Sequence, residues 1–300
     1  MNRIAILMTC HNRKVKTLRC LRSLEEGWSK TKYGIAISVF LTDDGCSDET
    51  AEAILSQEFP FPIHILRGDG NLFWNGGMIN SWEAALAEGG FDGYLWLNDD
   101  TYALPEVWGD LQAADSYSLK TYGKRGIYVG STKDVATGEF TYGGFNYVSK
   151  VTLLDQFLPP DGTSFQPCQA AHGNITYVSQ EVVDKMGIFC VKYWHGGSDH
   201  DYTYLAHKNG FPVLILPHYS AVCENDHIGT STDFASLPLI ERLRFAKTPR
   251  GFNLHNTLLF NRRCFPWRVP FVLLASIIKL IFPKFGYASY RKLRNRSYQK

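Results

Sequence analysis

The stretch GYLWLNDD, residues 93–100, runs from an apolar segment directly into Asn98, Asp99 and Asp100. A short apolar run bounded by polar residues is typical of a buried strand, so these three side chains would stand where the strand leaves the core. Carboxylates in contact repel each other, and the cluster therefore requires a cation or a proton. A divalent cation shared with substrate phosphates meets this need. Alternatively, one of the two acids caps the turn that follows.

Apolar runs alternate with helix-like stretches around this segment. Strand, helix, strand at this spacing predicts a doubly wound α/β domain, with a mostly parallel sheet flanked by helices. Ligands of such sheets bind beyond the carboxyl ends of the strands. All four expected strands end in polar groups, which predicts a site along one rim. The strands are expected at residues 3–10, 36–44, 61–68 and 93–100, and the helices at residues 13–26, 47–55 and 76–89.

The first helix and the second half of the chain give further expectations. On the first helix, one buried stripe is expected from Val15, Leu18, Leu21 and Leu24. Residues 125–175 alternate apolar and polar side chains, which predicts antiparallel hairpins. Two more helices and a last strand are expected at residues 180–189, 201–210 and 211–217.

The composition excludes several classes of protein. A formal net charge of +2 over 300 residues gives no field for binding nucleic acid. The seven cysteines contain no C-x-x-C pair, so neither a disulfide framework nor a zinc knot is expected, and a reducing compartment is favoured. The first apolar run, Ile4–Met8, is too short for a signal peptide. We therefore expect the protein to start in the cytosol.

The character of the chain changes near residue 236. From there to the end, Glu241 is the only acidic residue among many Arg and Lys. The apolar run Val269–Phe282 is too short and too interrupted for a membrane span, which needs about 20 apolar residues. Short apolar helices with basic and Trp flanks suit the interface of an anionic leaflet. Alternatively, these helices pack on the domain and the basic tail is simply solvated.

Two loops of the first half carry candidate ligand contacts. In TDDGCSDET, residues 42–50, Asp43 ends a strand and can accept a hydrogen bond from a nucleotide base or a ribose. An ordinary turn into a helix explains the rest of that segment. In RGDGNLFWNGGMIN, residues 67–80, Gly76 and Gly77 permit close backbone approach. This loop lacks the lysine of a P-loop and the glycine spacing of a dinucleotide-binding fingerprint.

A third segment, YWHGGSDHDYTYLAHKNG at residues 193–210, offers a base. Asp199 and Asp201 lie near the start of an expected helix, beside the aromatic residues Tyr193–His195. A carboxylate held there could take a proton from an attacking hydroxyl. Alternatively, an acid at this position caps the helix or stabilises its dipole. That structural role accounts for one of the two acids, and less easily for both.

Taken together, these segments resemble glycosyltransferase family 2, inverting enzymes of the GT-A fold. The resemblance runs in order from residue 4 to about residue 230. Within this family, the chain is most similar to bacterial enzymes that build cell-surface polysaccharide, such as rhamnosyl- and galactofuranosyltransferase-like members. The matching segments are ILMTCHNR, TDDGCSDET, GNLFWNGGMIN, LNDDT (the D-x-D region) and SDHDYTYLAHKNG. Asn98 stands where the family has the first acid of D-x-D, and Ser198 stands where an acid is common.

The resemblance implies a role for each matching position. Asp199 would be the catalytic base, and Asp100 would hold a divalent cation, Mg²⁺ or Mn²⁺. His227 would complete the metal shell, with His218 as an alternative. The nucleotide-sugar donor would be bound by Thr9, Asn12, Asp43, Asn71, Gly76, Gly77, Asn98 and Asp99, and the acceptor by Tyr193, Trp194, His195 and Asp201.

We expect a GT-A domain over residues 1–235 and a helical, membrane-associating extension over residues 236–300. Within the domain, residues 1–105 would bind the nucleotide-sugar and residues 106–235 the acceptor. The expected activity is sugar transfer to a glycan, lipid-linked at the cytoplasmic face of the inner membrane. The alternatives are a sugar nucleotidyltransferase, which should carry a glycine-rich basic loop after strand one, and a non-catalytic nucleotide-sugar-binding protein.

Overall fold

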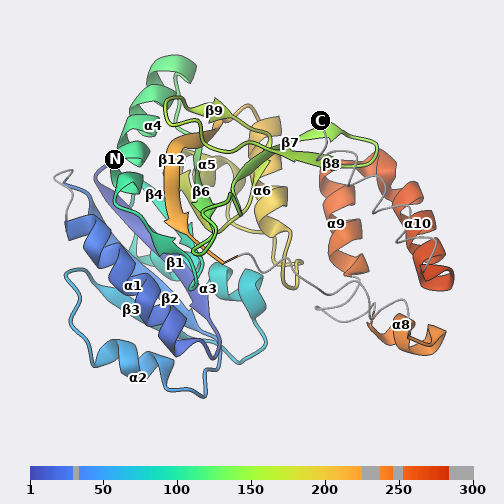
Figure 1. Ribbon diagram of the computed structural model, residues 1–300, viewed down its shortest axis with the longest axis horizontal. Helices are drawn as coiled ribbons and strands as arrows, with labels where there is room; N and C mark the ends of the chain where they lie inside the picture. The colour runs from blue at the N-terminus through green and yellow to red at the C-terminus, as the bar shows by residue number, and fades with distance from the viewer. Residues whose placement is uncertain (30–33, 225–236, 246–252, 284–300) are drawn as a thin grey trace.

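The order of the elements follows the alternation expected from the sequence. The structure, a computed structural model, describes residues 1–29, 34–224, 237–245 and 253–283 (Figure 1). The strands are β1 (Arg3–Cys10), β2 (Ala36–Asp43), β3 (Ile63–Arg67), β4 (Gly93–Leu97), β5 (Tyr102–Ala103), β6 (Ile127–Lys133), β7 (Gly144–Ser149), β8 (Leu154–Phe157), β9 (Gln166–Pro167), β10 (Ala170–Ala171), β11 (Ile175–Ser179) and β12 (Val213–Val222). The helices are α1 (Lys14–Ser29), α2 (Thr50–Leu55), α3 (Phe73–Glu88), α4 (Glu106–Tyr122), α5 (Gln180–Met186), α6 (Ser198–Lys208), α8 (Leu239–Phe245), α9 (Leu254–Cys264) and α10 (Val269–Ile281), with a 3₁₀ turn, η1, at Pro266–Arg268.

Parallel strands form the framework of the large sheet. Within the described residues it has nine strands in the order β3-β2-β1-β4-β11-β6-β12-β5, and β9 also pairs with β12. Six of these strands run in one direction, and β5, β9 and β11 run against them. The prediction of a mostly parallel sheet flanked by helices is confirmed. Because Cys10 pairs with Asp43 and Asp43 with Arg67, the carboxyl ends of β1, β2 and β3 lie level at one rim.

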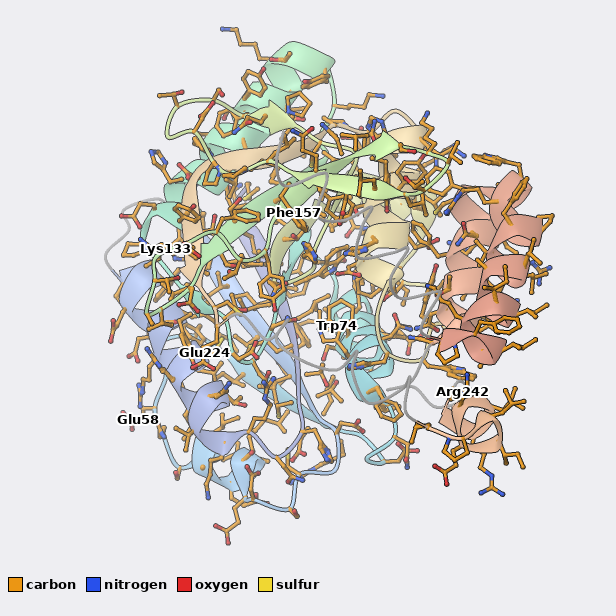
Figure 2. All side chains as sticks on the ribbon, turned by 45° about the vertical axis from the view of Figure 1, so that its right-hand side comes forward. Glu58, Trp74, Lys133, Phe157, Glu224 and Arg242 are labelled. Atoms are coloured by element: carbon orange, nitrogen blue, oxygen red, sulfur yellow. The ribbon has the colours of Figure 1, made fainter. Side chains whose placement is uncertain are left out.

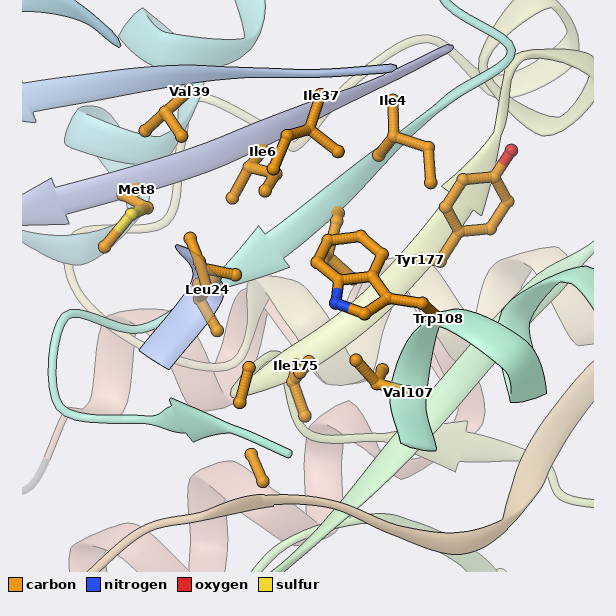
Figure 3. Packing of buried hydrophobic residues seen from close by; sticks show 14 of the residues in the cluster. Ile4, Ile6, Met8, Leu24, Ile37, Val39, Val107, Trp108, Ile175 and Tyr177 are labelled. Atoms are coloured by element: carbon orange, nitrogen blue, oxygen red, sulfur yellow. The ribbon is translucent and has the colours of Figure 1, made fainter. Parts of the chain in front are cut away.

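Side chains of the central strands alternate between two buried faces. On β1, Ile4, Ile6 and Met8 belong to one apolar cluster, and Ala5 and Leu7 to the other. The first cluster is covered by α1, α2 and α4, and the second by α3, α5 and α6. Figure 3 shows Leu24 of α1 and Trp108 of α4 in the first cluster. A parallel strand buried on both faces has apolar residues at consecutive positions, which explains the uninterrupted run at the start of the chain.

Two helices differ in detail from the sequence-based expectation. The buried residues of α1 include Leu21 and Leu24, whereas Val15 is 78% exposed. Val15, Leu18, Leu21 and Leu24 are spaced by three residues, and each such step falls about 60° short of a full helical turn. Over the three steps this places Val15 roughly opposite Leu24. The third helix begins at Phe73 and not at residue 76, so the predicted glycine loop is in part the first turn of α3.

The hairpins predicted over residues 125–175 account for only part of that segment. β7, β8 and β10 do form a small antiparallel sheet. β6, however, lies inside the large sheet, parallel to β12, and β11 fits between β4 and β6 in the reverse direction. Because β11 runs antiparallel to β4 and Ile175 pairs with Leu97, the start of β11 lies at the same rim of the sheet as the end of β4.

The C-terminal helices α8, α9 and α10 lie along one side of the molecule (Figure 1). α9 contacts α6 and α10, and the side chain of Arg268 donates to the carbonyl oxygen of Val151 at the end of the β7–β8 hairpin, at 3.0 Å. No helix in the described ranges is both long enough and apolar enough to cross a membrane. The domain boundary proposed near residue 235 falls among residues outside the described ranges.

Replacing Trp96 tests the packing between β4 and the α3–α6 layer. Trp96 is fully buried against Trp82, Phe189 and Tyr202. We expect Trp96→Ala to lower the free energy of unfolding by about 3–5 kcal/mol in urea titrations followed by circular dichroism. The control Trp267→Ala removes a half-exposed ring of η1 and should cost less than about 1 kcal/mol. Equal losses for both variants would contradict this assignment of the core.

Candidate active site

Asp43 and Asp44, at the end of β2, are both buried, but they have different partners. One carboxylate oxygen of Asp43 accepts from the backbone N–H of Cys46 at 2.7 Å, and the other accepts from the guanidinium of Arg67 at 2.6 Å. The predicted nucleotide-binding carboxylate is therefore held in place by the chain itself.

Asp44 fixes the start of α3 against the end of β2. Its carboxylate accepts from the backbone N–H groups of Gly70 at 2.8 Å, Leu72 at 3.3 Å and Phe73 at 3.0 Å. The first N–H groups of a helix have no partner within the helix, and a carboxylate there satisfies them and favours the helix dipole. This role of Asp44 was not expected from the sequence, in which the residues after Asp43 indicate only a turn into a helix.

The other predicted donor-binding residues of the first half lie around this junction. Gly77 packs on β1 so closely that a Cβ atom would stand 2.1 Å from the hydroxyl oxygen of Thr9. Asn71 and Gly76 line a hollow of about 440 Å³. The side-chain oxygen of Asn12 accepts from the backbone N–H of Ser47 at 2.7 Å, which joins the loops after β1 and β2.

Arg13 lies between the two acids that follow β4. One terminal guanidinium nitrogen donates to Asp99 at 2.9 Å, and the other donates to Asp100 at 2.7 Å. The oxygen of Asn98 is occupied by the indole N–H of Trp74, at 2.7 Å. The cation that the acidic cluster requires is thus present in the protein, at the end of β1.

A proton on Asp99 can also reduce the repulsion within the acidic cluster. The residue is 4% exposed. Burial raises the pKa of Asp99 to about 6; the positive charge of Arg13 opposes this shift, and the negative charge of Asp100 adds to it. Two neighbouring carboxylates that share one guanidinium are thus only partly neutralised.

Asp199 is held at the start of α6, across from this cluster. One of its carboxylate oxygens accepts from the backbone N–H of Gly173 at 2.9 Å, just before β11. The imidazole of His200 lies 3.9 Å from the same oxygen. Gly197 precedes the helix with a φ of 92°, a backbone conformation that glycine adopts readily.

Asp100 and Asp199 line one cavity of about 340 Å³. Asn98, Asp99 and His195 line it as well. An adjoining cleft of about 270 Å³, lined by Thr9, Asp44 and Gly70, leads to the end of β2. Arg13, Trp74, Asp99 and His195 border both spaces, and Figure 2 shows Trp74 near the centre of the molecule. The rim of the sheet thus carries one continuous recess with a carboxylate on each side.

The predicted acceptor residues are divided between this recess and a neighbouring hollow. His195 borders the recess, whereas Tyr193 and Trp194 line the 440 Å³ hollow beside the start of α3. The segment is held from two sides. Asn75 of α3 donates to the carbonyl oxygen of Tyr193 at 3.0 Å, and the ring of Trp194 stacks on His255 of α9 with centroids 4.3 Å apart.

Asp201 does not line the recess. It is buried, and both of its carboxylate oxygens accept from the Nε–H of Arg263 on α9, at 2.9 Å. Asn256, also on α9, donates to the carbonyl oxygen of Gly196 at 2.8 Å. The start of α6 is therefore connected to the C-terminal helices by an ion pair and by hydrogen bonds.

Few residues could hold a metal ion. No group of three or more His, Cys, Asp or Glu suited to a metal occurs in the described part of the chain. His227 lies outside the described residues, and His218, the alternative, pairs with Asp110 of α4 at 3.0 Å. Asp99 and Asp100 remain, and Mg²⁺ is usually held by one or two carboxylates together with substrate phosphates. The donor set fits a cation that arrives with a diphosphate.

Comparison with known proteins identifies the family. Residues 5–147 match the sequence model described as Glycosyl transferase family 2. The glycosyltransferase family 2 match is limited to these residues, slightly less than half of the chain. The prediction made from the ordered motifs is confirmed, and the matched residues include Arg13, Asp43, Asp99 and Asp100. No curated protein matches the sequence.

Solved structures with the GT-A fold resemble this chain over most of its length. TarS of S. aureus, residues 1–349, has a TM-score of 0.52 at 14% identity, covering 87% of this chain and 69% of that one. The same protein in complex with UDP-GlcNAc gives a TM-score of 0.53 at 12% identity, with 87% and 71% covered. The mannosyltransferase PcManGT from Pyrobaculum calidifontis, in complex with GDP-Man and Mn²⁺, gives 0.52 at 12% identity, with 99% and 84% covered. At these identities the likeness shows the fold alone.

The pKa of Asp99 predicts a pH-dependent stability. The pKa is raised in the folded state, so the proton on Asp99 stabilises the fold at low pH, and this contribution is lost as pH rises through about 6. Asp99→Asn remains neutral at every pH. Relative to wild type, we expect its free energy of unfolding to rise by about 1–2 kcal/mol between pH 5 and pH 8, measured by urea denaturation.

The exposed residue Asp184 provides the control for this comparison. Asp184→Asn should keep a constant difference from wild type over the same pH range. A constant difference for Asp99→Asn as well would contradict the assigned protonation of Asp99.

Proposed function

We propose that this protein is an inverting glycosyltransferase that moves a hexosyl or pentosyl group from a nucleotide diphosphate-sugar to a hydroxyl of a lipid-linked glycan. The observation that supports this most directly is the cavity that Asp100 and Asp199 share, continuous with the cleft at the ends of β1 and β2. Two of the structural neighbours are bound to UDP-GlcNAc and to GDP-Man. The reaction would serve cell-surface polysaccharide synthesis at the cytoplasmic face of the inner membrane.

Asp199 is the proposed base. The hydrogen bond from Gly173 fixes one carboxylate oxygen, and the other oxygen takes the proton of the acceptor hydroxyl. The new bond from the acceptor oxygen to the anomeric carbon forms as the bond to the diphosphate breaks. Because attack comes from the side opposite the leaving group, the configuration inverts.

Arg13, Asp99 and Asp100 form the proposed diphosphate end of the site. Asp100, with Asp99 beside it, would hold a divalent cation, Mg²⁺ or Mn²⁺, and that cation supplies positive charge to the leaving diphosphate. Arg13 lies in the same recess, and its fixed positive charge suits an anionic donor. In this proposal the guanidinium binds the diphosphate once the donor arrives, while Asp100 turns to the cation.

Nucleotide binding is assigned to the cleft beyond Arg13. Thr9, Asp44 and Gly70 line it, and Phe73 offers an aromatic face. Asp43 is assigned to the base or the ribose of the nucleotide. Because it is buried and both of its oxygens have partners within the chain, this role requires Arg67 to release its oxygen when the nucleotide binds.

A second candidate is a protein that binds nucleotide-sugars without turnover. The family's first metal acid is replaced by Asn98, and the Asn98 oxygen is bound to Trp74. That arrangement keeps the pocket while it removes a charge. A turnover assay separates the two functions.

The base is tested by a conservative substitution. We expect Asp199→Asn to lower the rate of nucleoside diphosphate release about 10²- to 10⁴-fold, because only proton transfer is removed. Donor affinity measured by calorimetry should stay within about threefold of wild type, since Asp199 lies on the acceptor side. A panel of UDP- and GDP-sugars with Mn²⁺ or Mg²⁺ first selects the donor.

Asp100→Ala and Asp184→Asn complete this series. Asp100→Ala should weaken both donor binding and turnover, and Asp184→Asn, on the far end of α5, should leave both unchanged. Wild-type turnover by Asp199→Asn would refute the assigned base. Donor binding by wild type without any release of nucleoside diphosphate would favour the passive binding protein.

A further inference from the structure

A groove of about 720 Å³ lies between α9, α10 and the segment that leads to Trp194. Its lining residues differ from those of the recess that contains Asp100 and Asp199. The lining residues are Cys190, Lys192, His255, Leu258, Leu259, Arg262, Arg263, Val269 and Leu273.

The groove combines basic and aliphatic side chains. Lys192, Arg262 and Arg263 carry positive charge. Arg263 forms an ion pair with Asp201, and within the described ranges Lys192 and Arg262 have no acidic partner. Of the described side chains that line the groove, none is acidic, and the sequence from residue 253 to 283 contains no Asp or Glu. The chemistry that fits such a groove is a negatively charged group attached to a hydrocarbon chain.

An apolar stripe on α10 continues outward from this groove. Phe271 is 67% exposed, Leu274 58% and Ile277 51%, at successive intervals of three residues along one side of the helix. Ile281 and Phe282 extend the stripe, and Trp267 lies beside its beginning. Figure 2 shows these helices along an outer edge of the molecule. Contiguous exposed apolar side chains on a folded protein mark a binding surface.

Basic side chains flank the stripe as they flank interfacial helices. Arg268 stands at the beginning of α10 and Lys279 near its end, and Arg242 and Arg244 stand on α8, which contacts α10. A helix that is apolar on one side and basic at its margins lies in the interface of an anionic bilayer. Nucleic acid would use the charges but not the stripe.

We infer that the groove and the stripe together bind an anionic bilayer, with a lipid phosphate between Lys192 and Arg262 and the apolar side chains of α10 among the acyl chains. This deepens the membrane contact of the proposed function by naming its residues and its lipid chemistry. Lys192 is three residues from His195, which borders the catalytic recess. The bilayer would therefore lie on the acceptor side of the site.

Vesicle co-sedimentation of the full chain tests this inference. We expect wild type to partition at least tenfold more strongly to vesicles of phosphatidylcholine with 30% phosphatidylglycerol than to phosphatidylcholine alone. Arg262→Glu should remove most of this preference, because it reverses one charge at the phosphate position. Ile277→Glu should weaken partitioning about tenfold or more, because it places a charge in the apolar stripe.

Matched controls stand elsewhere on the surface. Lys120→Glu reverses an exposed charge at the end of α4, and Leu55→Glu replaces an exposed leucine at the end of α2. Both should partition like wild type. Circular dichroism and release of nucleoside diphosphate from the donor, measured without vesicles, should be unchanged in Ile277→Glu.

Three outcomes would overturn the inference. The first is equal partitioning to both kinds of vesicle. The second is wild-type partitioning by Arg262→Glu and Ile277→Glu. The third is a dimer by light scattering that Ile277→Glu converts to a monomer, since the stripe would then bind a second copy of the chain. A loss of sugar transfer alone bears on the proposed function and leaves the vesicle result intact.

Discussion

The ion pairs of Arg13 with Asp99 and Asp100 are the constraint around which this site is arranged. Parallel strands bring their carboxyl ends to one rim, and here that rim collects several carboxylates in a buried position. Without a compensating charge, such a cluster would be too costly to bury. A planar guanidinium with two donating nitrogens reaches both acids at once, from the loop that follows β1. The pairing thus links the ends of β1 and β4, and it keeps a positive charge where an anionic ligand would bind.

The mostly parallel sheet, and the positions of its first strands along the chain, could be predicted from the sequence because strands buried on both faces have continuous apolar runs. The reversed strand β11 could not be predicted, since direction depends on which neighbour a strand pairs with and not on its own pattern. Likewise, apolar residues spaced every three positions drift around a helix that has about 3.6 residues per turn, so Val15 at one end of the series faces solvent. The local pattern of apolar residues thus predicts which residues are buried, but not which strand or helix they pack against.

The same distinction applies to the site. Asn98, Asp99 and Asp100 after β4, and Asp199 at the start of α6, could be chosen as candidates from the sequence because their positions relative to a strand or a helix are a local property. Arg13 and Asp44 were missed as partners, although both stand next to residues that were chosen. A basic residue after β1 in a chain with a buried acidic cluster was the available signal for Arg13. Nothing in the sequence indicated Asn256 or Arg263, because they act from a helix more than fifty residues away.

The hydrogen bonds and the ion pair between α9 and the start of α6 have a consequence for how such enzymes can be recombined. His255, Asn256 and Arg263 each form a hydrogen bond with a residue in the segment 192–201. A hybrid protein that exchanges C-terminal segments between relatives at residue 235 would separate α6, which carries the proposed base Asp199, from these contacts. Joining the two parts after Cys264 would transfer the outer helix and leave this support native.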